Sequence, residues 1–138
     1  MKNTGTLFED RFRNWHKDLE KVVCIKYPDN RTSGTYSRAI CDYLVLYKGI
    51  TMFIELKRTK NKVSFSFGLI RKHQLESLLD IAHTGNPAFF FVENGLRDLY
   101  LIQPAVIFAY VKNKKKSIKF DELSHCKITK KQYLDFIQ

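Results

Sequence analysis

Two acidic residues and a lysine lie in one hydrophobic stretch, CDYLVLYKGITMFIELK, near the middle of the chain. Asp42 precedes a first run of β-forming residues, and Glu55 and Lys57 end a second run. Lys48-Gly49 supplies a turn between the runs, so the stretch predicts a β-hairpin. Side chains alternate between faces along a strand, which would project Glu55 and Lys57 from one face. Ionised groups on a hydrophobic strand need a partner or a metal ion.

These residue types suit the metal-assisted hydrolysis of a phosphodiester. Two carboxylates from neighbouring strands, Asp42 and Glu55, can share one Mg²⁺, which prefers carboxylate, water and phosphate oxygens. Lys57 can hold or help deprotonate the attacking water and offset the charge that grows on the phosphate. A salt bridge on an exposed hairpin would give the same pattern, and the spacing alone leaves both interpretations open.

A helix is predicted over residues 6–21, before the hairpin. Its apolar stripe has a spacing of four, three and four residues and consists of Phe8, Phe12, Trp15 and Leu19. Thr6 followed by Glu9 has the form of a capping box. Glu9 would then either close this box or lean over the sheet toward the metal site.

Further elements follow the hairpin. Residues 71–83 predict a second helix, with Gln74 near its start, and the apolar segment 87–92 predicts a buried central strand. Strands are also expected over 22–27, 98–103 and 117–120, and helices from Pro104 and from about Thr129. The pattern predicts one α/β domain over residues 1–138, with a mixed β-sheet flanked by helices.

Basic residues dominate the composition. The 138 residues include 24 Lys and Arg against 14 Asp and Glu, a net charge of +10, which indicates a polyanionic partner such as nucleic acid. The segment 28–38, PDNRTSGTYSR, is rich in turn-forming residues and predicts an exposed basic loop. Its arginines and tyrosine could contact phosphates and stack on an unpaired base, unless the loop is a plain linker.

The chain resembles the RecU-like Holliday junction resolvases of the PD-(D/E)xK nuclease superfamily. The resemblance is carried by GTLFED at 5–10, CDYLVLYKG at 41–49, ELKRTKNKVSF at 55–65 and IRKHQLESL at 70–78. Two positions differ from the family pattern: Cys41 replaces the motif proline, and Ile40 stands where the family tends to carry threonine.

The resemblance implies a restriction-endonuclease-like αβββαβ core and assigns roles to residues. Asp42, Glu55 and Gln74 would bind Mg²⁺, for which Mn²⁺ can substitute, and Glu9 and Lys57 would complete the catalytic group. It also implies a homodimer. Taken with the basic residues near the site, it gives a set of expected DNA contacts: Arg31, Arg38, Arg58, Lys60, Lys62, Arg71 and Lys72.

The expected function is a structure-selective endonuclease that resolves four-way DNA junctions by paired symmetric nicks. Two alternatives remain open: a less selective nuclease that cuts flaps or duplexes, and a DNA-binding recombination factor without catalytic activity. The three cysteines lack the spacing of a disulfide framework or zinc site. Without a signal peptide or membrane-length apolar run, the expected location is the cytoplasm, that of the host if the protein is viral.

Overall fold

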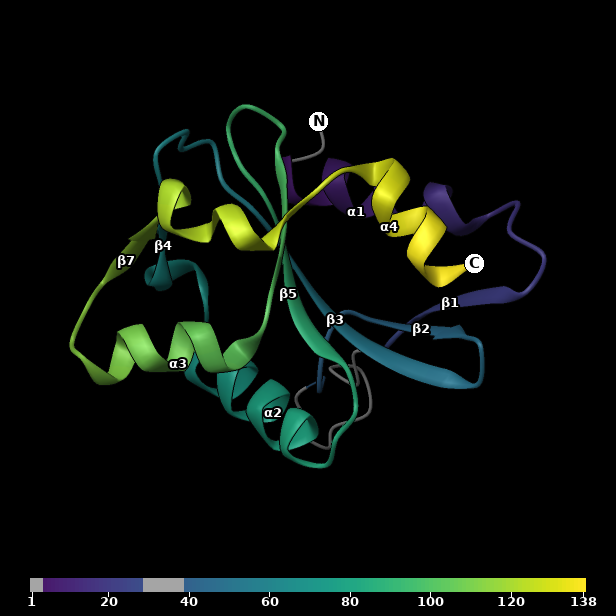
Figure 1. The fold of residues 1–138 in the computed structure, drawn as a ribbon, viewed down its shortest axis with the longest axis horizontal. Coiled ribbons are helices and arrows are strands. Elements are labelled where there is room, and N and C mark those ends of the chain that lie inside the picture. Colours follow the sequence, from purple (N-terminus) through teal and green to yellow (C-terminus); the bar gives the residue numbers. More distant parts are fainter. Residues whose placement is uncertain (1–3, 29–38) are drawn as a thin grey trace.

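The computed structural model describes residues 4–28 and 39–138, which form a mixed α/β fold (Figure 1). Most of the predicted basic loop, including Arg31 and Arg38, lies outside the described residues. The strands are β1 (Val22–Lys26), β2 (Tyr43–Tyr47), β3 (Ile50–Arg58), β4 (Ser64–Ser66), β5 (Ala88–Glu93), β6 (Leu99–Ile102), β7 (Ser117–Lys119) and β8 (Lys127–Ile128). The α-helices are α1 (Thr4–His16), α2 (Lys72–His83), α3 (Pro104–Lys112) and α4 (Lys130–Ile137). The 3₁₀ helices are η1 (Phe67–Leu69) and η2 (Phe120–Cys126).

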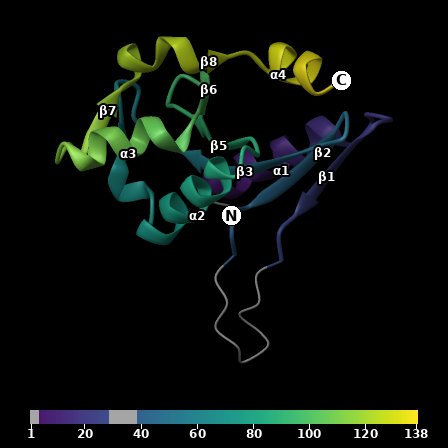
Figure 2. The ribbon, with the colours of Figure 1, turned by 60° about the horizontal axis from the view of Figure 1, so that its bottom comes forward.

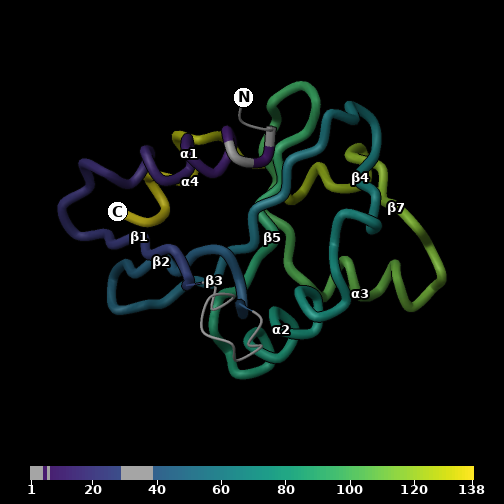
Figure 3. Tube along the Cα trace, turned by 180° about the vertical axis from the view of Figure 1, so that it is seen from behind, coloured from purple at the N-terminus to yellow at the C-terminus, as the bar shows by residue number. Residues whose placement is uncertain are grey.

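Six strands form the central sheet in the order β1-β2-β3-β5-β6-β8. Strands β3 and β5 are parallel, and the other neighbours are antiparallel. Parallel pairing requires a crossover, and the chain between β3 and β5 supplies it with β4, η1 and α2. A second sheet consists of β4 and β7, which lie side by side at the end of the molecule away from β1 (Figure 3).

The predicted hairpin is confirmed as β2 and β3. Lys48 and Gly49 connect the strands with φ angles of 49° and 74°. Two successive positive φ angles match the turn whose twist fits a two-residue hairpin, and glycine adopts such a conformation without steric cost. Tyr43, the first residue of β2, pairs with Ile54 of β3. Asp42 lies one residue before β2 begins.

Each face of the central sheet carries its own core, and β3 and β5 contribute alternate residues to both. Met52 and Ile54 face the core under α1 and α4, whereas Phe53 packs on the opposite side with α2 and α3. Phe90 and Phe91 divide between the two cores in the same way. Glu55 and Lys57 lie two and four residues after Phe53 in β3. They therefore point to the same face as Phe53, toward α2, as the alternation along the strand predicted.

Most predicted elements are confirmed, with differences at their ends. The helix expected over 6–21 is shorter and begins earlier, at Thr4. Leu19 follows the helix but still packs against the α1 core. The strand β8 and the helix η2 were not predicted, because their short segments lack a clear hydrophobic period. In the described residues, no helix is both long enough and apolar enough to cross a membrane.

A buried histidine joins α1 to α4. The Nδ1 atom of His16 lies 2.7 Å from the carbonyl oxygen of Phe12, and Nε2 lies 2.6 Å from the hydroxyl of Tyr133. A carbonyl only accepts, so Nδ1 carries the ring proton and Nε2 accepts the Tyr133 proton. Burial lowers the pKa of His16, which favours this neutral ring.

The neutral state of His16 predicts a pH-dependent stability. Below pH 6.5, the usual histidine value, the unfolded chain takes up a proton that the folded ring resists, so acid favours unfolding. Between the pKa values of His16 in the unfolded and folded states, each pH unit of acidification should cost the wild type up to about 1.4 kcal/mol of unfolding free energy relative to His16→Gln. Urea unfolding of both proteins across this range measures the difference. Parallel pH curves for the two proteins would contradict the expectation.

Candidate active site

Asp42 and Glu55 lie against each other where β2 separates from β3. The backbone N–H of Leu56 donates to Oδ2 of Asp42 at 2.8 Å, so the Asp42 side chain takes the place of a backbone acceptor beyond the last pair of the ladder. A side-chain hydrogen bond joins Asp42 to Glu55. The hairpin thus brings together two carboxyl groups that are 13 positions apart in the sequence.

Burial dominates the electrostatics of this pair. Glu55 is 4% exposed. Burial raises the pKa of Glu55 to about 8, with a further contribution from the negative charge of Asp42, while Lys57 opposes both effects. Burial also raises the pKa of Asp42, although the N–H of Leu56 favours its ionised form. A cation bound between the two acids would favour their full ionisation at neutral pH.

Lys57 and Gln74 bring further polar groups to Glu55. The Lys57 ammonium lies 3.8 Å from Oε1 of Glu55, and the Gln74 amide donates to the same oxygen at 3.0 Å. The Gln74 carbonyl oxygen accepts from the N–H of Arg71 at 2.9 Å, which closes the first turn of α2. The expectation that Gln74 helps to bind the metal stays a prediction. In the described structure Gln74 holds the Glu55 carboxyl in position.

Glu9 reaches the same region from α1. Its Oε1 accepts from the Lys26 ammonium at 2.6 Å and from the Tyr43 hydroxyl at 2.7 Å. Burial alone would raise the pKa of Glu9, but these two hydrogen bonds outweigh it and lower the pKa. The charge of Glu9 contributes to the raised pKa of Asp42, so the two carboxyl groups are close enough to interact. These contacts agree with the predicted position of Glu9 over the sheet.

The two carboxyl groups of the site fit a hard divalent cation. Asp42 and Glu55 supply two carboxyl groups whose mutual repulsion and burial a cation would relieve. Among residues 4–28 and 39–138 no group of three or more His, Cys, Asp or Glu side chains could hold a metal. Two carboxylates with remaining water ligands are typical of Mg²⁺, which keeps several waters when it binds proteins.

The basic residues expected at the DNA fall into two groups. Lys60 and Lys62 are exposed on the turn after β3, and Arg71 and Lys72 are exposed at the start of α2, next to Gln74. Arg58 is largely buried, with 12% of its side chain exposed, and its Nε lies 2.8 Å from Oε1 of Glu93; its expected contact with DNA stays a prediction.

The turn after β3 is built by its two polar residues. Asn61 Oδ1 accepts from the N–H groups of Val63 and Ser64, and the N–H of Asn61 donates to Thr59 Oγ1. Thr59 and Asn61 therefore shape the turn, and Lys60 and Lys62 alternate with them. The motif TKNK thus combines a fixed backbone with exposed charges.

Gly95 fastens this turn to the loop after β5. Its N–H donates to the carbonyl oxygen of Asn61 at 2.9 Å, and a Cβ at this position would collide with the carbonyl of Lys60. The two loops pack too closely for any side chain at residue 95. Neither this contact nor the ion pair of Arg58 was predicted, although an acid that ends the apolar strand FFFVE signals a buried partner.

Comparisons with known proteins identify the family of this chain. The family model RecU, Recombination protein U, matches residues 16–138. The chain belongs to the RecU family. It is 34% identical over 115 residues to a protein of Staphylococcus epidermidis named Holliday junction resolvase RecU, and 31% identical over 113 residues to the Bacillus subtilis protein of that name. Each alignment covers 75% of this chain and 54% of the relative, so this RecU chain spans about half the length of these curated relatives.

A solved structure shares the fold of this RecU chain. Hjc of Archaeoglobus fulgidus, described as a Holliday junction resolvase, superposes with a TM-score of 0.54 at 16% sequence identity. The match covers 73% of this chain and 78% of that protein. The predicted fold class, a mixed β-sheet flanked by helices, is confirmed.

The raised pKa of Glu55 predicts that this residue destabilises the fold at neutral and higher pH. The unfolded chain loses the Glu55 proton near pH 4.5, whereas the folded protein keeps it until about pH 8, so stability falls as pH rises between these values. Glu55→Gln should therefore gain roughly 1–3 kcal/mol over the wild type between about pH 5 and pH 8. Urea unfolding at both pH values measures this gain in stability. The control is Glu76→Gln, at an exposed position of α2, which should show no gain. An equal gain in both variants would contradict the assignment.

The close approach of the two loops at Gly95 predicts that a larger side chain at this position disrupts their packing. Gly95→Ala should force the two loops apart and lower the unfolding free energy by about 1–3 kcal/mol. Gly68→Ala is the control, since its Cβ would meet only the Ser66 hydroxyl at 3.4 Å. Thermal unfolding of both variants compares the costs. Equal stability of Gly95→Ala and the wild type would show that the loops can separate freely.

Proposed function

We propose that this RecU chain is a Mg²⁺-dependent endonuclease that resolves four-way DNA junctions. The observation that carries the proposal is the buried pair of Asp42 and Glu55, with the Lys57 ammonium 3.8 Å from Glu55. Such a pair destabilises a protein unless it serves a ligand. The names of the relatives, Holliday junction resolvase RecU and Hjc, support the choice of a branched substrate.

Each residue of the site has a distinct role in this proposal. Asp42 and Glu55 hold the cation, and Mn²⁺ can replace Mg²⁺ because it accepts the same oxygen ligands. When bound, the ion supplies a Lewis acid for a phosphate oxygen and lowers the pKa of a water. Lys57 stabilises the nucleophile and the charge on the scissile phosphate, and Gln74 orients Glu55 through its amide. Glu9 stays ionised beside Tyr43 and adds negative potential that favours the cation.

DNA binding comes from the basic residues around the site. Lys60 and Lys62 are exposed on the turn after β3, and Arg71 and Lys72 are exposed at the start of α2, next to Gln74. Arg31 and Arg38 of the basic loop are proposed to recognise the branch point. Phosphate contacts of this kind bind DNA without reading sequence, so junction preference would arise from shape. The protein would act in the cytoplasm, on DNA, and would not require a membrane.

A homodimer is proposed because a junction with two-fold symmetry needs two cuts. An apolar patch, the β1 patch, supports it: Val23 and Ile25 of the edge strand β1 and Leu46 of β2 are 54%, 43% and 36% exposed. Val23 pairs with Leu46 across the strands, so the side chains lie on one face. These strands extend beyond α2 and α3 (Figure 2), which leaves room for a second copy. Contiguous exposed apolar residues of this kind mark interaction surfaces.

A cleavage assay tests the activity. The substrates are an immobile four-way junction, a linear duplex and a flap of matching sequence, each with and without Mg²⁺. The wild type should make paired symmetric nicks in the junction alone, with 5′-phosphate and 3′-hydroxyl ends. Asp42→Asn should cut at least about 100-fold more slowly, because losing a metal ligand removes several kcal/mol of transition-state stabilisation.

The same assay separates the proposal from its alternatives. Asp42→Asn should still bind the junction, because the basic surface remains, and Glu76→Gln should cut as the wild type does. Cutting of all three substrates would keep the metal site but replace junction resolution with general nuclease activity. Binding without cutting at any Mg²⁺ concentration would favour a non-catalytic DNA-binding factor.

The dimer proposal predicts the effect of a charge in the β1 patch. Val23→Glu should weaken self-association at least about tenfold, because an unpaired carboxylate would be buried at the interface. Val111→Glu places the same charge at a 41% exposed position of α3 and should leave association unchanged. Analytical ultracentrifugation measures both. A monomeric wild type, or equal effects of the two substitutions, would contradict the proposed interface.

A further inference from the structure

A basic pocket lies on the other side of β3 from the carboxyl pair. It has a volume of about 300 Å³ and is lined by Leu7, Asp10, Arg11, Asn14, Arg58 and Arg97. Four of these residues belong to α1, Arg58 ends β3, and Arg97 lies in the loop between β5 and β6. The pocket therefore sits at the edge where the parallel strands β3 and β5 end, a common position for ligands in α/β sheets. None of Asp42, Glu55 and Lys57 lines it.

A buried carboxylate holds two of the arginines in place. Glu93 is 1% exposed, and its two oxygens accept from Nη1 and Nη2 of Arg11 at 2.6 and 2.7 Å. The Nε of Arg58 lies 2.8 Å from Oε1 of the same carboxylate, and its Nη1 donates to the carbonyl oxygen of Thr59. Both guanidinium groups are thus oriented before any ligand arrives, which lowers the entropic cost of binding one.

The charges around the pocket do not cancel. Glu93 offsets one of the three lining arginines, and the carboxylate of Asp10 pairs with Arg13 at 2.6 Å. Counting Arg13, which pairs with Asp10 but does not line the pocket, four arginines stand against two carboxylates and leave two positive charges in excess. The pocket favours an anion.

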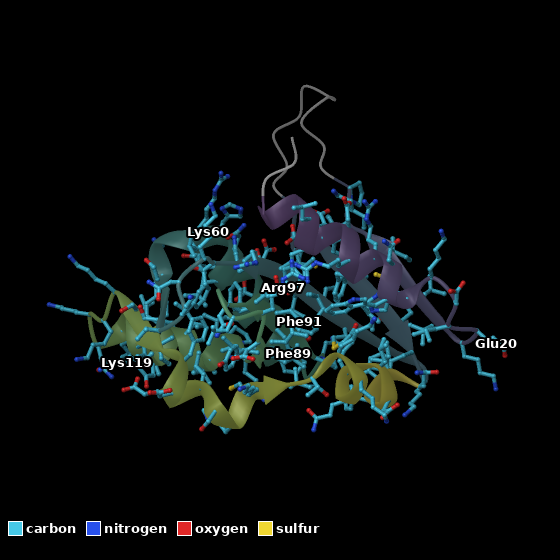
Figure 4. The ribbon with its side chains drawn as sticks, turned by 90° about the horizontal axis from the view of Figure 1, so that it is seen from above. Glu20, Lys60, Phe89, Phe91, Arg97 and Lys119 are labelled. Carbon is cyan, nitrogen blue, oxygen red and sulfur yellow. The ribbon has the colours of Figure 1, made fainter. Side chains whose placement is uncertain are left out.

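The loop that carries Arg97 is rigid and strained. The side-chain oxygen of Asn94, which is 1% exposed, accepts from the N–H groups of Leu96 and Asp98, and the N–H of Arg97 donates to the carbonyl of Asn94. Arg97 itself has a φ of 63°, a conformation that glycine adopts without cost and arginine does not. Strain of this kind persists where the surrounding structure imposes it, and it gathers at functional sites. Figure 4 shows Arg97 next to α1.

We propose that this pocket binds one phosphate of the DNA backbone and forms a second anchor beside the cutting site. The inference rests on the proposed function, because it takes DNA as the ligand. Guanidinium groups in fixed orientations match the oxygens of a phosphate with paired hydrogen bonds. Lys57 and Arg58 are consecutive at the end of β3 but project from opposite faces of the sheet, so a DNA molecule that lies across this sheet edge would contact both sites. A strand gripped here cannot rotate away from the carboxyl pair.

The test replaces Arg97 by glycine, which removes the guanidinium and suits the local backbone. DNA binding is measured by fluorescence anisotropy without Mg²⁺, in an Asp42→Asn background, with a labelled junction over a range of salt concentrations. Arg97→Gly should weaken binding roughly threefold to tenfold, and the slope of log K against log salt should fall by about one. Its melting temperature should match or exceed that of the parent protein.

Lys131→Ala is the control, since it removes one positive charge from α4, where the lysine pairs with Asp135 at 2.7 Å. It should leave affinity and salt slope unchanged. An unchanged affinity of Arg97→Gly, or equal weakening in both variants, would overturn the pocket assignment while leaving junction cleavage by the wild type intact.

Melting temperatures with inorganic phosphate at constant ionic strength test the other source of the anion. Stabilisation that depends on Arg97 without any effect on DNA affinity would assign the pocket to a free anion and overturn the proposal. A wild type that neither binds nor cuts DNA would overturn both this inference and the proposed function.

Discussion

The joint burial of Asp42 and Glu55 is the constraint on which the rest of this structure depends. The fold buries two carboxyl groups together, and burial raises the pKa of Glu55 to about 8. A protein selected only for stability would separate these acids or pair each with a base. Here the hairpin turn, the N–H of Leu56 and the amide of Gln74 all hold them in place. In the proposed function, this arrangement accepts a cation.

The two faces of the central sheet differ in how they support this site. On the α1 face, Phe8, Phe12, Trp15, Phe91 and Tyr133 make a dense aromatic core, with neighbouring ring centroids 5.1 to 6.3 Å apart. On the α2 face the core stops short of the strand ends, where polar side chains collect. A rigid packed layer behind β3 fixes the backbone, so Glu55 and Lys57 project from a strand that cannot easily shift.

Local patterns allowed the hairpin, the faces of β3 and most helices to be predicted from the sequence. These features depend on residues that are close in the chain, so hydrophobic period and turn composition carry the signal. The ion pair of Arg11 with Glu93 joins residues 82 positions apart, and the bond from Tyr133 to His16 spans 117. Neither leaves a local pattern. The position of Gln74 was predicted, but its contact with Glu55 was not, because one amide can face either an ion or a carboxylate.

The most direct test of this account is a calorimetric titration of Mg²⁺, with Mn²⁺ as a second probe, into the wild type near pH 7 in two buffers of different ionisation enthalpy. A carboxyl pair that keeps a proton until about pH 8 should release about one proton for each ion bound. Asp42→Asn should bind the ion at least about tenfold more weakly. Mg²⁺ binding without proton release, or equal affinity in Asp42→Asn, would contradict the claim that this buried pair is the metal site.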